Sequence, residues 1–120
     1  MEIGQFTKKE REAIQNCFDE KVKKEILETV NEGVDNVHGK SHGVTLYFDP
    51  NYRWIKIITT CDINDRDTSN VAVLDQRMKD KAELILGKIE KIFAENEILY
   101  KGCTYCALYY NPIILDFFFQ

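Results

Sequence analysis

The clearest pattern in the chain is an apolar residue at every fourth position of its first third: Ile14, Phe18, Val22, Ile26 and Val30. Thr7, followed three residues later by Glu10, precedes this repeat and has the pattern of a capping box at a helix N-terminus. The repeat predicts a helix over residues 8–32, with Gly33 as its stop. Because a four-residue repeat drifts around a helix of about 3.6 residues per turn, the segment either wraps over a curved partner or breaks near Phe18-Asp19 into two helices.

A second helical repeat lies in the middle of the chain. Its apolar residues are spaced by three and four: Leu74, Met78, Ala82, Ile85, Ile89 and Phe93. This spacing predicts a helix from about Val71 to Glu95, with its charged residues largely on other faces. Gly87 inside that helix costs about 1 kcal/mol relative to alanine, which indicates close packing against a strand.

Two other stretches are rich in β-branched and aromatic residues, and each contains a turn signal. In the first, apolar and more polar positions alternate at Val44, Thr45, Leu46, Tyr47 and Phe48. After the turn Asp49-Pro50-Asn51, residues 53–61 are predicted as the partner strand. Residues 103–120 carry one charge and break at Asn111-Pro112, which predicts a second hairpin. Its phenylalanine-rich end would aggregate if unpaired, so this hairpin is placed at the sheet centre, with 98–101 starting its first strand.

The predicted order is α-β-β-α-β-β, an α+β fold with an antiparallel sheet of two hairpins and two main helices in one domain, residues 1–120. One face of the strands is expected to be largely aliphatic and to meet the helices, with Val44, Leu46, Phe48, Ile55, Ile57, Cys106, Leu108, Ile113, Leu115 and Phe117. The other is expected to carry Tyr47, Trp54, Ile58, Tyr105, Tyr109, Ile114 and Phe118, together with the more polar Thr45, Lys56 and Asp116. With both helices on the first face, the second exposes an aromatic patch typical of a contact surface. One helix on each face would leave nothing exposed, and both arrangements stay open because the strand register is not known.

Composition narrows the class of protein. Of 120 residues, 44% are apolar and 30% charged, as is usual for a globular domain with its own core. The net charge of −4 argues against nucleic acid as a partner, since phosphate binding needs concentrated Lys and Arg. No apolar run is long enough to span a membrane and no secretory signal is visible. The expected location is therefore the cytoplasm, where the four cysteines stay reduced.

One ligand set with zinc-like chemistry is present: His38, His42, Cys103 and Cys106. Each pair has an acceptable spacing, but the order and the gap between the pairs do not match a zinc finger, so no metal or other cofactor is expected. The CxxC of the two cysteines starts an expected strand, which argues against a redox site of the thioredoxin type. There is no GxSxG, glycine-rich phosphate loop or EF-hand pattern. A nucleophilic Cys17 or Cys61 paired with either histidine has no motif behind it, and an enzyme is not expected.

Two features favour protein binding instead. Residues 62–67 hold three aspartates against one arginine, which leaves a local net charge of −2 in a polar stretch. The aromatic face supplies Tyr and Trp, which are over-represented among residues that dominate binding. The predicted partner-binding residues are Asp62, Asp65, Asp67, Tyr47, Trp54, Tyr105 and Tyr109.

A compact acidic chain with apolar strand pairs and no catalytic motif resembles the small immunity proteins of bacterial toxin systems, including contact-dependent inhibition. The resemblance covers size, charge and element order, and no residue of that family can be carried over. It implies a cytoplasmic, non-enzymatic inhibitor that binds one cognate toxin domain. Acidic residues would then meet the basic cleft of a nuclease toxin. The alternatives are a self-associating domain, with the aromatic face as a homodimer seam, a small-ligand-binding domain, or a zinc-binding protein.

Overall fold

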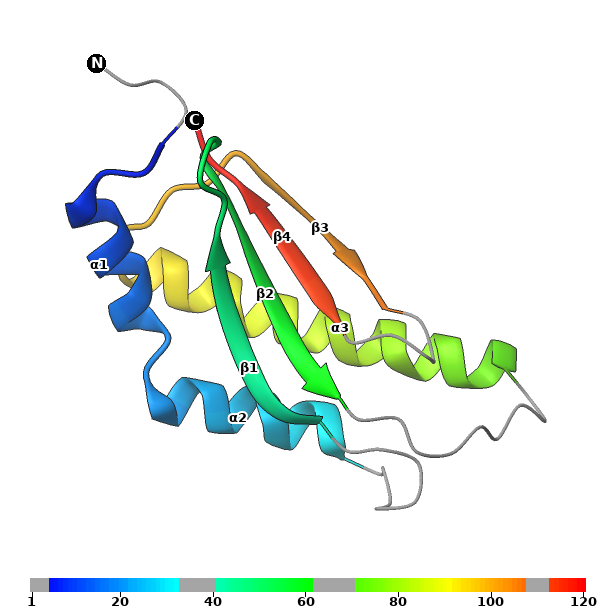
Figure 1. Ribbon diagram of the computed structural model, residues 1–120. Coiled ribbons are helices and arrows are strands. Elements are labelled where there is room, and N and C mark those ends of the chain that lie inside the picture. The colour runs from blue at the N-terminus through cyan, green and yellow to red at the C-terminus, as the bar shows by residue number, and fades with distance from the viewer. Residues whose placement is uncertain (1–4, 33–40, 62–70, 108–112) are drawn as a thin grey trace.

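The computed structural model describes residues 5–32, 41–61, 71–107 and 113–120, a part of the chain that contains three helices and four strands (Figure 1). In chain order these are α1 (Lys8–Cys17), α2 (Glu20–Asn31), β1 (Ser41–Phe48), β2 (Trp54–Cys61), α3 (Val71–Glu95), β3 (Gly102–Cys106) and β4 (Ile114–Phe118). The strands form one antiparallel sheet in the order β1-β2-β4-β3. The predicted α+β class and both hairpins are confirmed.

The first helical segment is divided into two helices, which is one of the two arrangements that the four-residue repeat allowed. α1 begins with the predicted capping box, in which Thr7 Oγ1 accepts from Glu10 N at 3.1 Å and Glu10 Oε1 accepts from Thr7 N at 3.0 Å. It ends at Phe18, whose ψ of 58° is not helical. Asp19 Oδ1 then accepts from Val22 N at 2.9 Å and begins α2. The bend keeps the apolar sides of both helices in the core.

The C-terminal end of α2 is held by a side chain from α3. Lys81 Nζ donates to the backbone oxygens of Val30 at 2.7 Å and Glu32 at 2.8 Å. A cation at a helix C-terminus is favourable, because the last carbonyls have no partner within the helix. Burial nevertheless lowers the pKa of the Lys81 ammonium. α2 itself ends at Asn31, and the predicted stop at Gly33 lies outside the described residues.

The position of the C-terminal hairpin in the sheet differs from the prediction for one of its strands. β4 lies in the interior between β2 and β3, whereas β3 is an edge strand. β4 belongs inside because Leu115 and Phe117 are 1% and 0% exposed, while β3 is only half-buried or exposed along its length. A strand of five residues is also a tolerable edge, since it leaves few backbone groups unpaired.

α3 has the predicted bounds, but the glycine inside it does not pack against a strand. Gly87 is exposed, and a Cβ added to it would meet no atom within 4 Å. The residue lies on the outward side of α3, opposite the buried stripe that contains Ile85 and Ile89. The prediction of close packing at Gly87 was therefore wrong.

The C-terminal end of α3 explains why residues 98–101 are not a strand. Glu97 has a φ of 57°, in the left-handed region, and the amide of Ile98 donates to Phe93 O at 2.8 Å. With the bond from Glu97 N to Ala94 O at 3.2 Å, this is a Schellman motif. The chain leaves the helix through this motif, and β3 begins only at Gly102.

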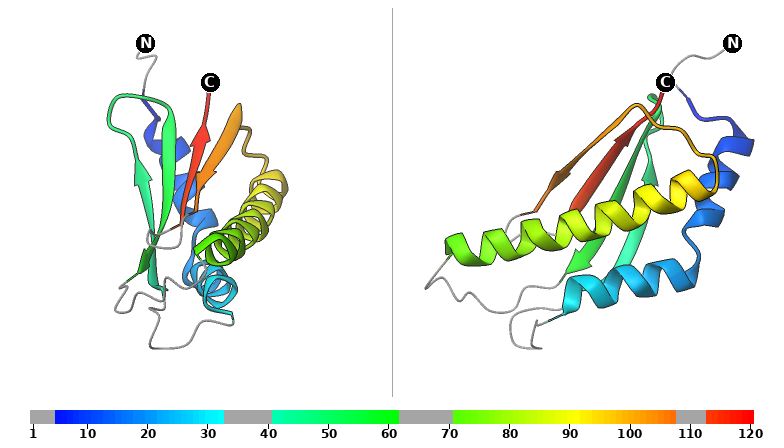
Figure 2. Two further views of the ribbon diagram at one scale, coloured as in Figure 1. Left: turned by 90° about the vertical axis from the view of Figure 1, so that its right-hand side faces the viewer. Right: turned by 180° about the vertical axis from the view of Figure 1, so that it is seen from behind.

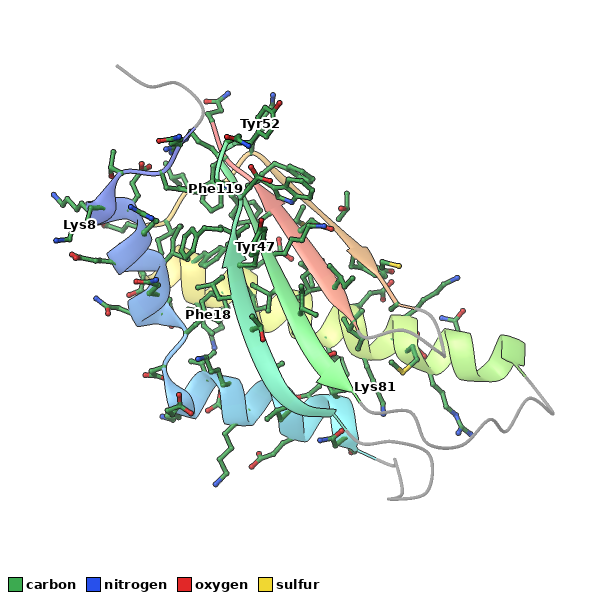
Figure 3. All side chains as sticks on the ribbon, viewed as in Figure 1. Lys8, Phe18, Tyr47, Tyr52, Lys81 and Phe119 are labelled. Atoms are coloured by element: carbon green, nitrogen blue, oxygen red, sulfur yellow. The ribbon has the colours of Figure 1, made fainter. Side chains whose placement is uncertain are left out.

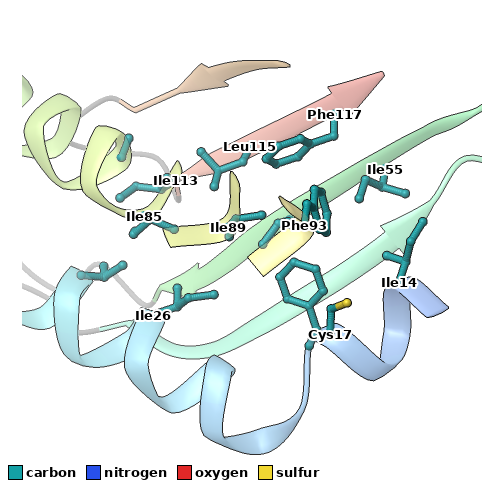
Figure 4. Close-up of a cluster of buried hydrophobic side chains, with 14 of the residues drawn as sticks. Ile14, Cys17, Ile26, Ile55, Ile85, Ile89, Phe93, Ile113, Leu115 and Phe117 are labelled. Atoms are coloured by element: carbon teal, nitrogen blue, oxygen red, sulfur yellow. The ribbon is translucent and has the colours of Figure 1, made fainter. Parts of the chain in front are cut away.

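All three helices lie on the same side of the sheet, so the core is a single layer between helices and strands (Figure 2). Figure 4 shows that side chains from both layers meet there. The ring of Phe93 lies at its centre and makes edge contacts with Phe18 at 6.0 Å and Phe117 at 5.1 Å. Thr59 is the buried polar residue of the described part, and its Oγ1 accepts from Ile113 N at 3.0 Å.

Candidate functional site

Because the helices cover one face of the sheet, the opposite face is covered by no described helix (Figure 2). This is the first of the two arrangements that the sequence left open. The face, called the open face below, carries Thr45, Tyr47, Trp54, Lys56, Ile58, Gly102, Thr104, Cys106, Ile114, Asp116 and Phe118. It combines large aromatic groups with one central pair of opposite charges, which is the composition of a contact surface.

A cluster of three side chains lies at the middle of the open face. Trp54 Nε1 donates to Asp116 Oδ1 at 2.9 Å, and Lys56 Nζ lies 3.6 Å from the same oxygen. The ammonium of Lys56 is also 4.4 Å from the centroid of the Trp54 ring. Each member of this Trp54–Lys56–Asp116 cluster therefore contacts the other two. The indole is held in one orientation before any partner arrives, which reduces the entropy lost on binding.

Aromatic rings extend the cluster on two sides. The Phe118 ring stacks on Trp54 with centroids 5.6 Å apart and an angle of 21° between the planes. Tyr47 of β1, labelled in Figure 3, lies opposite Lys56 of β2. Tyr47 is 45% exposed and Phe118 is 37% exposed. Tyr52, in the turn before β2, is 67% exposed. These rings offer a large area that a partner can cover.

An open pocket of about 740 Å³ lies at the end of the sheet where β2 and β3 begin and β4 ends. Trp54, Phe118 and Tyr52 supply aromatic walls, Gly102 supplies backbone without a side chain, and Lys101 supplies a positive charge. The pocket thus continues the open face at one end.

Arg53 also borders the pocket, but its charge is neutralised by α1. Its Nη1 and Nη2 donate to the two carboxylate oxygens of Glu10 at 2.7 and 2.5 Å, and the guanidinium lies 5.1 Å from the centroid of Phe6. The hydrogen bond from Arg53 lowers the pKa of Glu10 from 4.5 to about 2. This bidentate pair attaches the start of α1 to the end of the sheet.

Tyr105 does not lie on the open face, so its predicted placement was wrong. It pairs with Leu115, which is buried toward the helices, and its hydroxyl donates to Glu83 Oε1 of α3 at 2.9 Å. That hydrogen bond raises the pKa of Tyr105. Cys106, which was expected on the aliphatic face, occupies the open face instead. Tyr105 and Cys106 are both partly apolar, so the sequence of β3 did not determine which of these two neighbours faces the helices.

The register also separates the two cysteines of the CxxC. Cys103 pairs with buried Phe117 and Cys106 with Ile114, so their side chains leave opposite faces of β3. The two thiols cannot bind one ion while the strand is formed, which removes the zinc set from the alternatives. Burial raises the pKa of the Cys103 thiol. Within the described residues, no three potential metal ligands come together.

Several predicted site residues cannot be placed. Asp62, Asp65, Asp67, Tyr109 and His38 lie outside the described residues, as does the side chain of His42. Of the predicted partner-binding residues, Tyr47 and Trp54 are therefore the ones that the structure brings together on the open face.

Lys56, Asp116 and Phe118 were expected on this face of the sheet but were not among the predicted binding residues. The sequence did contain a signal for the ion pair, because a lysine and an aspartate that lie on the same face of two neighbouring strands can pair across them. The ion pair can be predicted only if the register of β2 against β4 is known. These strands pair residues about sixty positions apart, and no tight turn joins them to fix that register.

Comparison of the chain with protein-family models, with curated proteins and with solved structures found no match in any of the three. The search for a membrane-crossing helix among the described residues was also negative, since none of the helices there is long and apolar enough. The open face and the pocket at its end are therefore the features from which a function can be inferred.

Proposed function

We propose that this chain is a non-enzymatic protein-binding inhibitor and that its open face is the surface that contacts the partner. The Trp54–Lys56–Asp116 cluster is the observation that carries the proposal, because it fixes a half-buried indole on a face that no described helix covers. Tyr47 and Phe118 add exposed rings beside it. Tyr and Trp dominate the energetics of many protein interfaces, chiefly when they are held rigidly near the centre.

The resemblance to bacterial immunity proteins specifies the partner as a cognate toxin domain in the cytoplasm. The net charge of −4 favours a partner with a basic cleft, such as a nuclease. The aspartates of residues 62–67 that would meet such a cleft lie outside the described residues, so this part of the proposal rests on the sequence. The open face supports protein binding without specifying the reaction that is inhibited.

The test is capture of the partner from the native cell by the tagged chain and by variants of it. Tyr47→Ala and Phe118→Ala each remove an exposed ring from the open face, and Leu84→Ala is the matched control, because Leu84 is 59% exposed on α3. We expect one protein to be captured stoichiometrically by the native and Leu84→Ala chains and lost with both ring variants. Capture that is equal for all four chains would show that another surface binds the partner.

The inhibitor part of the proposal is tested with the captured partner. Adding the native chain to that partner at a stoichiometric ratio should abolish its enzymatic activity or its toxicity in cells, and the Tyr47→Ala chain should do so only at higher concentration. Binding without any loss of the partner's activity would contradict inhibition and leave only the binding function.

Self-association is a second candidate, and the central charge pair favours it. Lys56 and Asp116 are neighbours near the middle of the open face, so a two-fold axis that passes between two copies at this point would place each lysine near the other copy's aspartate. Sedimentation of the purified chain at several concentrations separates the candidates. A dimer that Tyr47→Ala converts to a monomer would make the open face a homodimer seam.

A further inference from the structure

At one end of the open face, three residues on neighbouring strands lie in a row, and the last of them is a glycine without a side chain. Trp54 lies opposite Phe118, and Phe118 lies opposite Gly102. The first two rings are stacked with centroids 5.6 Å apart. Neighbouring strands in a sheet are about 4.8 Å apart, so the space above Gly102 is the next position of the same stack.

Phe118 does not fill that space itself. A ring beside a glycine in a sheet often lies over the glycine and covers it. Here a Cβ added to Gly102 would meet no heavy atom within 4 Å, its two chain neighbours aside, so no other described side chain lies over this residue. Phe118 is 37% exposed and Gly102 lines the pocket next to it. One side of the stack is therefore free to receive another ring.

The charges around the pocket leave one cation without a partner. Lys56 pairs with Asp116, and Arg53 pairs with Glu10. Lys101 lines the pocket and has no ion pair within the part of the chain that the structure describes. Among the side chains that line the pocket, Lys101 therefore leaves one positive charge unpaired in the described part, and this charge complements an anion that lies close to an aromatic ring.

We infer that this pocket receives an aromatic side chain of the partner protein next to a carboxylate, with the ring stacked on Phe118 above Gly102 and the carboxylate paired with Lys101. The inference rests on the proposed function and names the segment that the open face recognises. Offset stacking adds to the gain from burying the ring. The lysine selects segments in which an acidic residue, or a terminal carboxylate, is adjacent to that ring.

The direct test is a titration with small probes of this chemistry. N-acetyl-L-tryptophan carries a ring and a carboxylate, N-acetyl-L-tryptophanamide has the ring without the charge, and N-acetyl-L-leucine has the charge without a ring. The backbone amide resonances of Gly102 and Phe118 in ¹H–¹⁵N NMR spectra report binding. We expect a saturable shift with the first probe at millimolar concentration, an affinity lower by about two- to five-fold with the amide, and no saturable shift with the leucine derivative.

Variants make the test specific to the vacant position. Gly102→Val fills the space above the glycine and should abolish binding of N-acetyl-L-tryptophan, with the Phe118 resonance as the readout. Lys101→Gln, an exposed change, should lower its affinity to that of the amide. Gly87→Ala is the control, because Gly87 also has no atom within 4 Å of an added Cβ but lies on α3. Unchanged binding to the Gly102→Val chain, or equal binding of the leucine derivative, would overturn the inference.

The same variant separates this inference from the proposed function. If capture of the partner is lost with Tyr47→Ala and unchanged with Gly102→Val, the open face binds the partner but the pocket does not, and the inference is wrong. If both variants lose the partner, both statements are supported. If neither does, the proposed function fails, and the probe titration alone decides whether the pocket binds an aromatic anion.

Discussion

Replacement of Asp116 tests whether its carboxylate holds the indole of Trp54 in place. The Asp116 side chain is 16% exposed, accepts from Trp54 Nε1 at 2.9 Å and lies 3.6 Å from Lys56 Nζ. Asp116→Ala removes both interactions. Asp116→Asn keeps an oxygen that can accept from the indole and removes the charge. Lys56→Met removes the ion pair with Asp116 and the cation–π contact with Trp54, but it keeps an apolar side chain of similar length.

The sizes of these effects follow from the exposure of the groups. A hydrogen bond to a charged acceptor contributes about 1.5–3 kcal/mol when buried, and the lower end applies because Trp54 is only half-buried. An ion pair with a lysine that is 31% exposed contributes about 0.5 kcal/mol, and the cation–π contact contributes a similar amount. We therefore expect losses in the free energy of unfolding of about 2 kcal/mol for Asp116→Ala and about 1 kcal/mol each for Asp116→Asn and Lys56→Met.

Urea unfolding followed by fluorescence measures these losses, because Trp54 is the one tryptophan of the chain. A loss of about 2 kcal/mol moves the midpoint by about 1 M if the slope is about 2 kcal/mol per molar. High salt should reduce the ion-pair part of the Lys56→Met effect and leave most of the Asp116→Ala effect. Equal losses for Asp116→Asn and Asp116→Ala would show that charge, rather than the hydrogen bond, holds the cluster. Native stability in all three variants would refute the argument that the indole is fixed in advance.

Three further predictions concern the scaffold behind the open face. Because the pKa of Glu10 is about 2 in the fold and about 4.5 when unfolded, its carboxylate stabilises the fold above about pH 4.5 and loses that effect as the pH falls toward 2. Glu10→Gln should therefore cost about 1 kcal/mol near neutral pH, after allowance for screening of a side chain that is 36% exposed, and only a small fraction of that near pH 2. An undiminished loss near pH 2 would contradict the pairing with Arg53. Lys81→Met removes the donor to the last carbonyls of α2 and should lower the free energy of unfolding in urea by about 1–2 kcal/mol. The backbone amides of α2 should also exchange faster with solvent, and unchanged exchange would contradict the capping role of Lys81. Glu97→Gly, at a φ of 57°, should raise stability by about 0.5–1 kcal/mol in the same assay, and a decrease would show that the Glu97 side chain stabilises the turn.

Local features were predictable because their causes lie within a few residues. Thr7 and Glu10 satisfy the first amides of α1 whatever the rest of the chain does, and Asp19 can begin a new helix because its carboxylate reaches an amide three residues later. The bounds of α3 followed from a repeat that is independent of its partner. Such signals determine the elements and, through the hairpins, most of the sheet.

The open face depended on contacts that no local pattern encodes. β2 and β4 are joined by pairing such as Lys56 with Asp116, and a shift of one residue would have exchanged the two faces of β4. β3 shows the difficulty directly, because Tyr105 and Cys106 are both plausible on either side. On the side that it takes, Tyr105 pairs with Leu115, and its hydroxyl reaches Glu83 of α3. A sequence pattern does not contain that distance.

The central charge pair gives the open face a property that an all-aromatic face would lack. An uncovered sheet face with a Trp, a Tyr and a Phe has a tendency to associate non-specifically with other chains, and charges at its centre oppose such non-specific association. Lys56 and Asp116 satisfy each other and the indole, so a partner can cover them without supplying matching charges. Lys101, at the end of the face, has no such internal partner among the described residues. On this argument the rings provide most of the binding free energy, and the unpaired charge at the rim fixes the orientation in which the partner binds.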